Sequence, residues 1–255
     1  MVQDTGSYWS GFGQTVILLL IQIGGLGVIT AAVTFLMLSG KNISLKERSA
    51  MQDAISAPVV GGIVRLTRFI LKGTFFVELV GALALLPAFC RDYGLRGVWM
   101  AVFHSVSAFC NAGFDLFGHF SSLTAFQNEP LVLLTISTLI VLGGTGFAVL
   151  GEVTRQRFQW RELSLHSRLV LGMTGVLLLM GMTFFCLTEW RNPATLGGIS
   201  GAGNKLVNAL MQSTTMRTAG FNSVDLASMR QSSKLMSIIP VSYTHLRAHE
   251  TRRHL

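Results

Sequence analysis

Two stretches, far apart in the chain, share one design. Residues 103–114 read FHSVSAFCNAGF, and residues 210–221 read LMQSTTMRTAGF. Each is a short segment that closes on Ala-Gly-Phe, so that Gly113 and Gly220 stand at matching positions. A helix of about 12 residues is too short to cross the roughly 30 Å apolar core of a bilayer. Such segments can enter a membrane only beside longer helices.

Longer apolar stretches flank both segments. Charge-free runs cover residues 12–38, 131–151 and 169–188, and a fourth stretch, 69–89, carries only Lys72 and Glu78. Hydrophobic residues make up 50% of the chain and charged residues 13%, against about 25% charged in a soluble domain. The sequence therefore predicts an all-α integral membrane protein with about four to five spanning helices.

A second pair of motifs indicates an internal repeat. Gly-Gly-Leu-Gly at residues 24–27 and Gly-Gly-Thr-Gly at residues 143–146 precede and follow the first short segment. The order of long helix, short helix, loop and long helix recurs, which favours repeated units. Because the helices expected over 98–109 and 204–215 are too short to span the membrane, we expect them to be re-entrant. The irregular segment after each helix must then be buried in protein or line a wet cavity. The glycine motifs lack the ending of a phosphate loop and predict close helix packing.

The charges predict an orientation and exclude one class of partner. Six basic residues lie in 41–72 and four in 151–168, whereas 90–130 holds only Arg91 and Arg96. By the positive-inside rule the two basic regions are cytoplasmic and 90–130 is outside. The uneven distribution of the basic residues thus explains the net charge of +8 as a feature of membrane topology. We therefore expect no nucleic acid partner.

The chemistry predicted for the two Ala-Gly-Phe loops is cation coordination by backbone carbonyls. Glycine permits backbone angles that turn carbonyls inward, and the C-terminal end of a short helix carries partial negative charge. The candidate filter residues are Cys110, Asn111, Ala112, Gly113, Arg217, Thr218, Ala219 and Gly220. The side chain of Arg217 should point away from the pore, toward Asp225 or another outer carboxylate.

Three acids are candidates for the mouth or the support of this pore. Asp115 and Asp225 follow the two loops on the outer side, where they either concentrate cations or are ordinary solvated loop acids. Glu78 is an acid within a membrane helix, and either a functional or a purely structural role fits it. His104 is expected to be an interfacial hydrogen-bonding residue and not a metal ligand.

Four motifs together resemble the Trk/Ktr/HKT superfamily of potassium transporters, and most closely its Ktr-type (NtpJ-like) membrane subunits. They lie at residues 21–28, 104–118, 142–147 and 217–222. The resemblance covers nearly all of residues 1–239. It implies a potassium-channel-like fold of helix–pore-loop–helix units with two re-entrant pore helices here: 1–40 ends repeat 1, 41–150 forms repeat 2, and 151–239 is part of repeat 3.

The resemblance also implies a function and partners. It implies potassium uptake across a bacterial cell membrane by a multi-pass protein, with potassium as the transported ligand and no cofactor. The implied partners are membrane lipid, a second copy and a cytoplasmic nucleotide-binding regulatory subunit. Because such proteins carry four repeats around one pore, a fragment with two filter loops is not expected to transport alone.

Several alternatives stay open from the sequence. The transported ion can be sodium, and a membrane scaffold without transport is a different class. A membrane enzyme is disfavoured because the histidines before residue 240 are scattered. Residues 240–255, which hold three of the six histidines, look foreign to the fold; a metal- or lipid-binding tail is the alternative. Three cysteines without metal-ligand spacing predict no disulfide framework.

Overall fold

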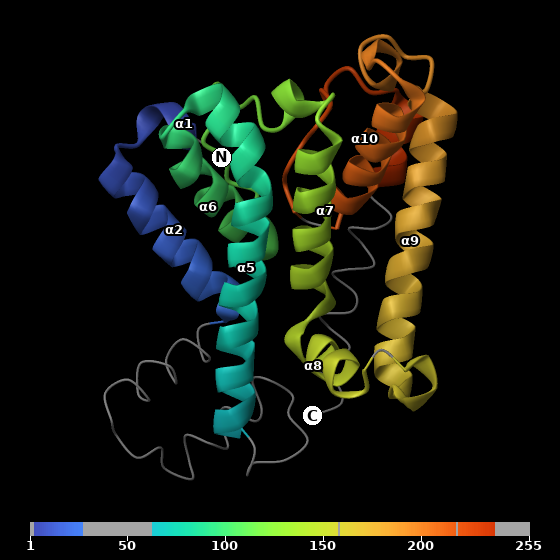
Figure 1. The fold of residues 1–255 in the computed structure, drawn as a ribbon. Coiled ribbons are helices and arrows are strands. Elements are labelled where there is room, and N and C mark those ends of the chain that lie inside the picture. The colour runs from blue at the N-terminus through green and yellow to red at the C-terminus, as the bar shows by residue number, and fades with distance from the viewer. Residues whose placement is uncertain (1–2, 28–62, 158, 218, 238–255) are drawn as a thin grey trace.

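The structure is a computed structural model that describes residues 3–27, 63–157, 159–217 and 219–237. Within these ranges the chain forms helices and loops and no strand (Figure 1). The elements are α1 (Thr5–Tyr8), α2 (Gly11–Leu26), α5 (Ile63–Tyr93), α6 (Arg96–Phe109), η2 (Thr124–Phe126), α7 (Pro130–Thr145), α8 (Phe147–Arg155), η3 (Trp160–Glu162), α9 (Leu165–Glu189), η4 (Leu196–Gly198) and α10 (Ala202–Thr215). Residues 231–237 are helical as well.

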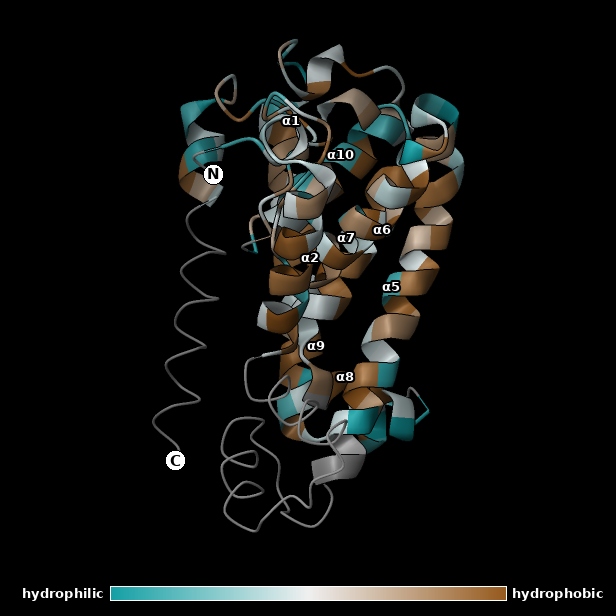
Figure 2. Ribbon diagram, turned by 90° about the vertical axis from the view of Figure 1, so that its left-hand side faces the viewer, coloured by the Kyte–Doolittle hydropathy of each residue, from teal (hydrophilic) through white to brown (hydrophobic). Residues whose placement is uncertain are grey.

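Two of the described helices, α5 and α9, are long and apolar enough to cross a membrane. The 25 residues of α9 extend roughly 37 Å, more than the bilayer core requires. Figure 2 shows the apolar colours along the shafts of the upright helices and polar colours toward their ends. A third span is present if α7 and α8 count as one bent helix, and α2 is apolar but has 16 residues. The described part thus accounts for two to three of the predicted spans.

Both glycine motifs end a helix, which corrects two sequence predictions. The expected helix over 131–150 is broken at Gly146, and the axes of α7 and α8 are 99° apart. The expected helix over 12–38 stops at Leu26, and its remainder lies outside the described residues. Gly27 and Gly146 have φ values of +83° and +92°. A residue in this region cannot continue a right-handed helix, and only glycine adopts it without a steric penalty.

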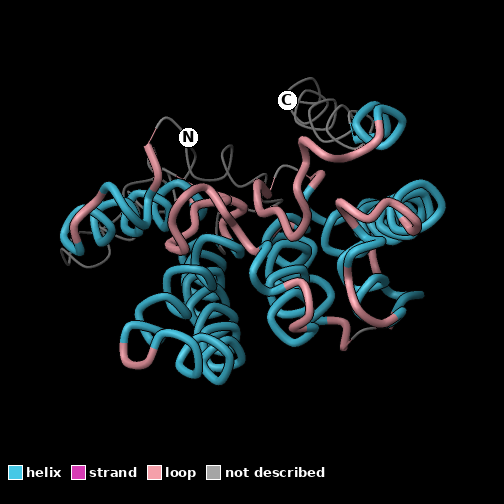
Figure 3. The backbone as a smooth tube through the Cα atoms, turned by 90° about the horizontal axis from the view of Figure 1, so that it is seen from above, coloured by secondary structure: helices cyan, strands magenta, loops and turns pink. Residues whose placement is uncertain are grey.

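The short helices α6 and α10 end where the sequence predicts, at residues 109 and 215. Helix α6 packs against α5, α7 and α2, and α10 packs against α9 and α7. Seen from above, most of these helices are viewed nearly end-on (Figure 3).

Each short helix packs against its long neighbour through a serine on the short helix that lies against a glycine on the long one. Ser105 Oγ donates to the carbonyl of Glu78 over 2.6 Å, next to Gly81 on α5. Ser213 Oγ donates to the carbonyl of Leu178 over 2.9 Å, and it lies against Gly181 on α9. Although the serines differ by one position when Gly113 is aligned with Gly220, the two units share this docking contact.

Two carboxylates stabilise the ends of α9. At its start, Glu152 of α8 accepts hydrogen bonds from the backbone and the hydroxyl of Ser164, the N-cap residue. At its end, the fully buried Glu189 accepts bonds from Asn192, Thr195, Ser233 and the N–H of Arg230. Four donors offset the desolvation of this acid. Glu189 thereby connects α9 to the segment before α10 and to the helix over 231–237.

Candidate functional site

The loops that follow α6 and α10 meet backbone to backbone at their glycines. A Cβ placed on Gly113 would lie 2.6 Å from the Ala219 carbonyl oxygen and 2.8 Å from the Gly220 Cα. A Cβ on Gly220 would lie 3.1 Å from the Gly113 Cα. Both glycines also have positive φ values, +69° and +82°. The contact therefore requires glycine at both positions, because a side chain would lack space and because the backbone conformation favours glycine.

Each loop is bonded back to its own short helix through its N–H groups. The N–H groups of residues 110–112 donate to carbonyls of residues 106–108 over 2.9 to 3.1 Å. In the second loop, the N–H groups of Arg217 and Ala219 donate to the last two residues of α10 over 3.1 and 3.0 Å. The N–H groups of these five residues are therefore occupied, and their carbonyl oxygens are the backbone groups that could bind a cation. The negative C-terminal ends of both helices adjoin them.

Two buried side chains of α6 hold the first loop from behind. Ser107 Oγ donates to the Phe114 carbonyl over 2.8 Å and accepts the Phe114 N–H over 2.9 Å. His104 Nδ1 lies 2.7 Å from the Met100 carbonyl, and the N–H of Leu116 donates to Nε2 over 3.3 Å. His104 is fully buried and forms hydrogen bonds, as predicted.

Ser107 is not among the predicted site residues, although its spacing from His104 in the sequence indicates a role. Ser107 follows His104 by three residues, so the two polar side chains share one face of an otherwise apolar helix. Polar groups in that setting must find hydrogen-bond partners. Here Ser107 finds its partner, Phe114, in the loop after the helix, and His104 bonds both to that loop and to Met100 within α6.

The glycine motifs allow α2 and α7 to approach the first loop closely, as predicted. A Cβ on Gly25 of α2 would overlap Cys110, and a Cβ on Gly143 of α7 would overlap the Phe109 carbonyl oxygen. Gly144 lies beside side chains of both loops, Asn111 and Arg217. The motifs thus lie behind the loops and support them.

Glu78 lies at the inner end of the first loop and is almost fully buried. Its carboxylate accepts a hydrogen bond from Gln22 of α2 over 3.2 Å, and the Cys110 thiol lies 4.0 Å away. The side chain therefore connects α5, α2 and the first loop residue.

The two acids that follow the loops differ in exposure. Asp225 is exposed and accepts bonds from the Ala227 N–H and the Ser228 hydroxyl. Asp115 is buried, and its Oδ1 accepts the Phe117 N–H over 3.2 Å. The guanidinium of Arg217 lies 4.0 Å from a Cβ placed on Gly144 of α7.

Burial is the main cause that raises the pKa of Asp115 to about 6. The Phe117 N–H opposes this rise, and the neighbouring Asp4 carboxylate adds to it. The charge of Asp115 is therefore present above about pH 6 and is lost below it.

The raised pKa of Asp115 predicts a pH dependence of stability. The folded chain keeps this proton to a higher pH than the unfolded chain, so the free energy of unfolding falls as pH rises from about 4 to 6. The fall amounts to about 1.4 kcal/mol for each unit by which the two pKa values differ. Asp115→Asn should flatten this part of the profile in thermal unfolding of the detergent-solubilised chain. An unchanged profile in the variant would contradict the assignment.

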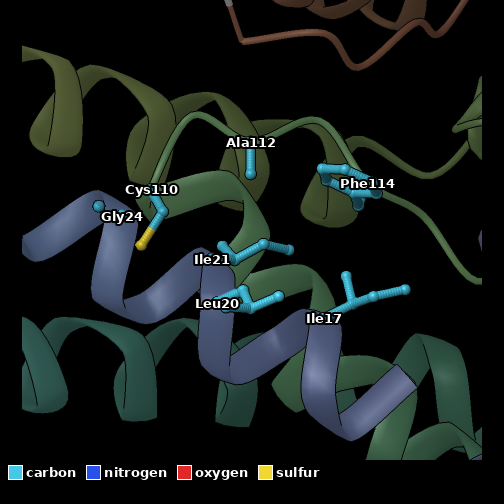
Figure 4. Close-up of a pocket in the computed structure, with 8 residues that line it drawn as sticks. Ile17, Leu20, Ile21, Gly24, Cys110, Ala112 and Phe114 are labelled. Atoms are coloured by element: carbon cyan, nitrogen blue, oxygen red, sulfur yellow. The ribbon is translucent and has the colours of Figure 1, made fainter. Parts of the chain in front are cut away.

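A cleft of about 380 Å³ opens between α2 and the first loop. Figure 4 shows Ile17, Leu20 and Ile21 of α2 on one side and Cys110, Ala112 and Phe114 on the other. The lining is apolar, so this cleft offers no side-chain ligands to an ion.

The structure describes all but one of the other predicted filter residues. Ala112, Gly113, Ala219 and Gly220 lie together where the loops meet, and Thr218 lies outside the described residues. In the described ranges, no group of three or more His, Cys, Asp or Glu side chains could hold a metal ion. The predicted tail over 240–255 also lies outside the described residues.

Comparisons with known proteins show the family of the chain. Residues 1–242 match the model of the TrkH family, described as cation transport protein. The chain is 40% identical over 239 residues to the Ktr system potassium uptake protein B of Bacillus subtilis (strain 168), covering 93% of this chain and 53% of that protein. It is 37% identical over 243 residues to the protein of the same name from Vibrio alginolyticus, covering 93% and 52%.

A third relative is the potassium/sodium uptake protein NtpJ of Enterococcus hirae. It is 35% identical over 237 residues, which cover 92% of this chain and 51% of that protein. The chain therefore spans about half the length of the curated relatives that it matches. The family and these relatives are transporters and not enzymes.

Proposed function

Because the chain belongs to the TrkH family of cation transport proteins, we propose that it forms part of a potassium-uptake pore in a bacterial cell membrane. The selectivity filter is built from backbone carbonyls of residues 110–113 and 217–220. One observation carries the proposal, the contact of Gly113 with Gly220 at the ends of two short helices. Three relatives are named potassium uptake or potassium/sodium uptake proteins, which supports the choice of ion.

The physical basis is replacement of the hydration shell of the ion. Carbonyl oxygens at a constriction can substitute for water around a monovalent cation, and no charged side chain is required. The C-terminal ends of α6 and α10 add negative potential at the loops. Asp115 and Asp225 follow the loops at the outer mouth, and Glu78 supports the first loop from below.

The arrangement of elements supports a division of the chain into repeats. In this proposal residues 1–40 end a first unit, 41–150 form a second helix–pore-loop–helix unit, and 151–239 form part of a third. The serine-over-glycine docking of α6 on α5 and of α10 on α9 supports the correspondence. Two loops cannot close a ring, so further filter segments complete the pore, and a cytoplasmic nucleotide-binding subunit regulates a dimer of the complete protein.

Potassium uptake tests the function in a full-length context. Residues 1–239 are grafted in place of the matching stretch of the Bacillus subtilis relative, and the chimera is expressed in cells without their own potassium importers. We expect growth at low potassium and uptake that saturates with potassium concentration. A chimera that inserts into the membrane but takes up no monovalent cation would support the scaffold alternative instead.

Sodium is the second candidate ion, because one relative is named a potassium/sodium uptake protein. Potassium uptake by the chimera, measured in the presence of increasing sodium, distinguishes the two ions. Sodium that inhibits potassium uptake only at large excess indicates a potassium filter. Sodium uptake at equal efficiency would place the chain in a sodium-permeable branch.

The re-entrant path of α6 predicts that both of its flanks are outside the cell. Leu95 is 92% exposed and Phe120 is 59% exposed, so a cysteine at either position is accessible. In a chain with Cys90, Cys110 and Cys186 replaced by serine, Leu95→Cys and Phe120→Cys should both react with an impermeant thiol reagent in intact cells. Trp160→Cys, on the predicted cytoplasmic side, should react only after permeabilisation. Labelling of Leu95→Cys alone, or of Phe120→Cys alone, would mean that 96–114 crosses the membrane.

A further inference from the structure

We propose that Ser122 is a positioning residue that holds the second filter segment in place and thereby sets ion selectivity. The inference rests on the proposed function and concerns a residue outside the filter itself. Ser122 lies in the loop between α6 and α7, nine positions after Gly113 and about 100 residues before the segment that it contacts.

The backbone of Asn222 is held on both sides by this loop. Its N–H donates to Ser122 Oγ over 2.9 Å, and its carbonyl accepts the N–H of Leu123 over 2.9 Å. Ser122 is 7% exposed, and Leu123 is fully buried. Asn222 follows Gly220 by two residues, so these bonds fix the outer end of the second filter segment.

The two filter segments are supported differently behind their helices. In the first unit His104 and Ser107 bond to the segment that follows α6. When Gly113 is aligned with Gly220, their counterparts are Met211 and Thr214. Met211 accepts a bond from Ser137 of α7, and the Thr214 hydroxyl donates within α10 to Leu210. The side chains of both counterparts therefore bond elsewhere. The second filter segment is held instead by Ser122, which belongs to the loop after α6, whereas the first filter segment is held by side chains of α6 itself.

The loop that carries Ser122 is itself fixed. Ser122 has a φ of +49°, and the backbone N–H of Ser121 donates to the Gly118 carbonyl over 3.0 Å. The Phe120 N–H donates to Asp4 over 3.4 Å. A loop held in this way can transmit a defined position to Asn222. Loss of the Ser122 hydroxyl leaves the N–H of Asn222 without this acceptor and frees the exit of the second filter segment.

Ser122→Gly tests the inference, because glycine removes the hydroxyl and still accepts the positive φ of this position. In the transporting chimera we expect the discrimination of potassium against sodium to fall about five-fold, the effect of one lost hydrogen bond, with unchanged amounts of protein in the membrane. Ser121→Ala is the matched control. It removes a neighbouring hydroxyl that bonds within its own loop, and it should leave discrimination unchanged.

Hydrogen exchange measures the contact itself in the chain alone, in lipid nanodiscs. The amide of Asn222 should exchange about five-fold or more faster in Ser122→Gly and at the parental rate in Ser121→Ala. Discrimination that survives Ser122→Gly in a transporting chimera would overturn the inference and leave the proposed function standing. Unchanged protection of Asn222 would overturn it whether or not the chimera transports.

Discussion

Replacing Gly113 or Gly220 with serine is expected to abolish potassium uptake or to reduce discrimination against sodium by at least about ten-fold. Both residues have positive φ, where a side chain costs roughly 1–2 kcal/mol. A Cβ on Gly113 would also lie 2.6 Å from the Ala219 carbonyl oxygen, so the two loops must move apart. Because the filter depends on carbonyl positions, such a shift changes the site directly.

Asn111→Gly is the control for the two glycine variants, because glycine accepts the φ of +52° that Asn111 has. The Asn111 side chain lies beside Gly144 of α7 and outside the contact between the glycines, and its carbonyl survives the substitution. Uptake should therefore change less than in either serine variant. Unchanged affinity and selectivity in both Gly113→Ser and Gly220→Ser would mean that the pore lies elsewhere.

Gly143→Ala is expected to destabilise the chain strongly, whereas Gly24→Ala should be neutral or slightly stabilising. The two glycines occupy the same position in the two glycine motifs. A Cβ on Gly143 would overlap the Phe109 carbonyl oxygen at the end of α6, and rigid backbone cannot yield as a side chain can. Overpacking of this kind costs about 1–3 kcal/mol or more. Among the described residues, no atom outside the adjacent backbone of α2 lies within 4 Å of a Cβ on Gly24, where alanine gains up to about 1 kcal/mol of helix propensity.

Thermal unfolding of the detergent-solubilised chain compares these two variants. A lower melting temperature for Gly143→Ala, with Gly24→Ala at or above the parent, is the expected order. Equal melting temperatures would contradict the close packing of α7 on the end of α6. In the transporting chimera, Gly143→Ala should also reduce uptake, since Phe109 adjoins the first filter residue.

Local patterns in the sequence were sufficient to predict the short helices and the position of the loops. The ends of α6 and α10 at residues 109 and 215 follow from apolar segments that stop before Asn-Ala-Gly and Thr-Ala-Gly. The close packing at Gly25 and Gly143 follows from the small size of glycine. The breaks at Gly27 and Gly146 did not follow, because a glycine inside an apolar run is compatible both with a continuous helix and with its end.

Features that depend on distant contacts could not be predicted. Asp115 and Asp225 occupy comparable places after their loops, yet only Asp115 is covered, by the region around Asp4 and Phe117. The bond from Asn222 to Ser122 joins residues 100 positions apart. The burial of Glu189 likewise depends on donors from residues 192–233. Spacing within one helix or loop carries no information about such pairs.

The position of a bound cation tests the central claim most directly. Rubidium is a potassium substitute whose anomalous scattering locates it in crystals of the complete chimera. The account predicts a peak beside the carbonyl oxygens of residues 110–113 and 217–220, on the side of the filter that faces the pore axis, and its loss in Gly113→Ser. A permeating ion located away from both loops, with these carbonyls outside coordination distance, would contradict the account.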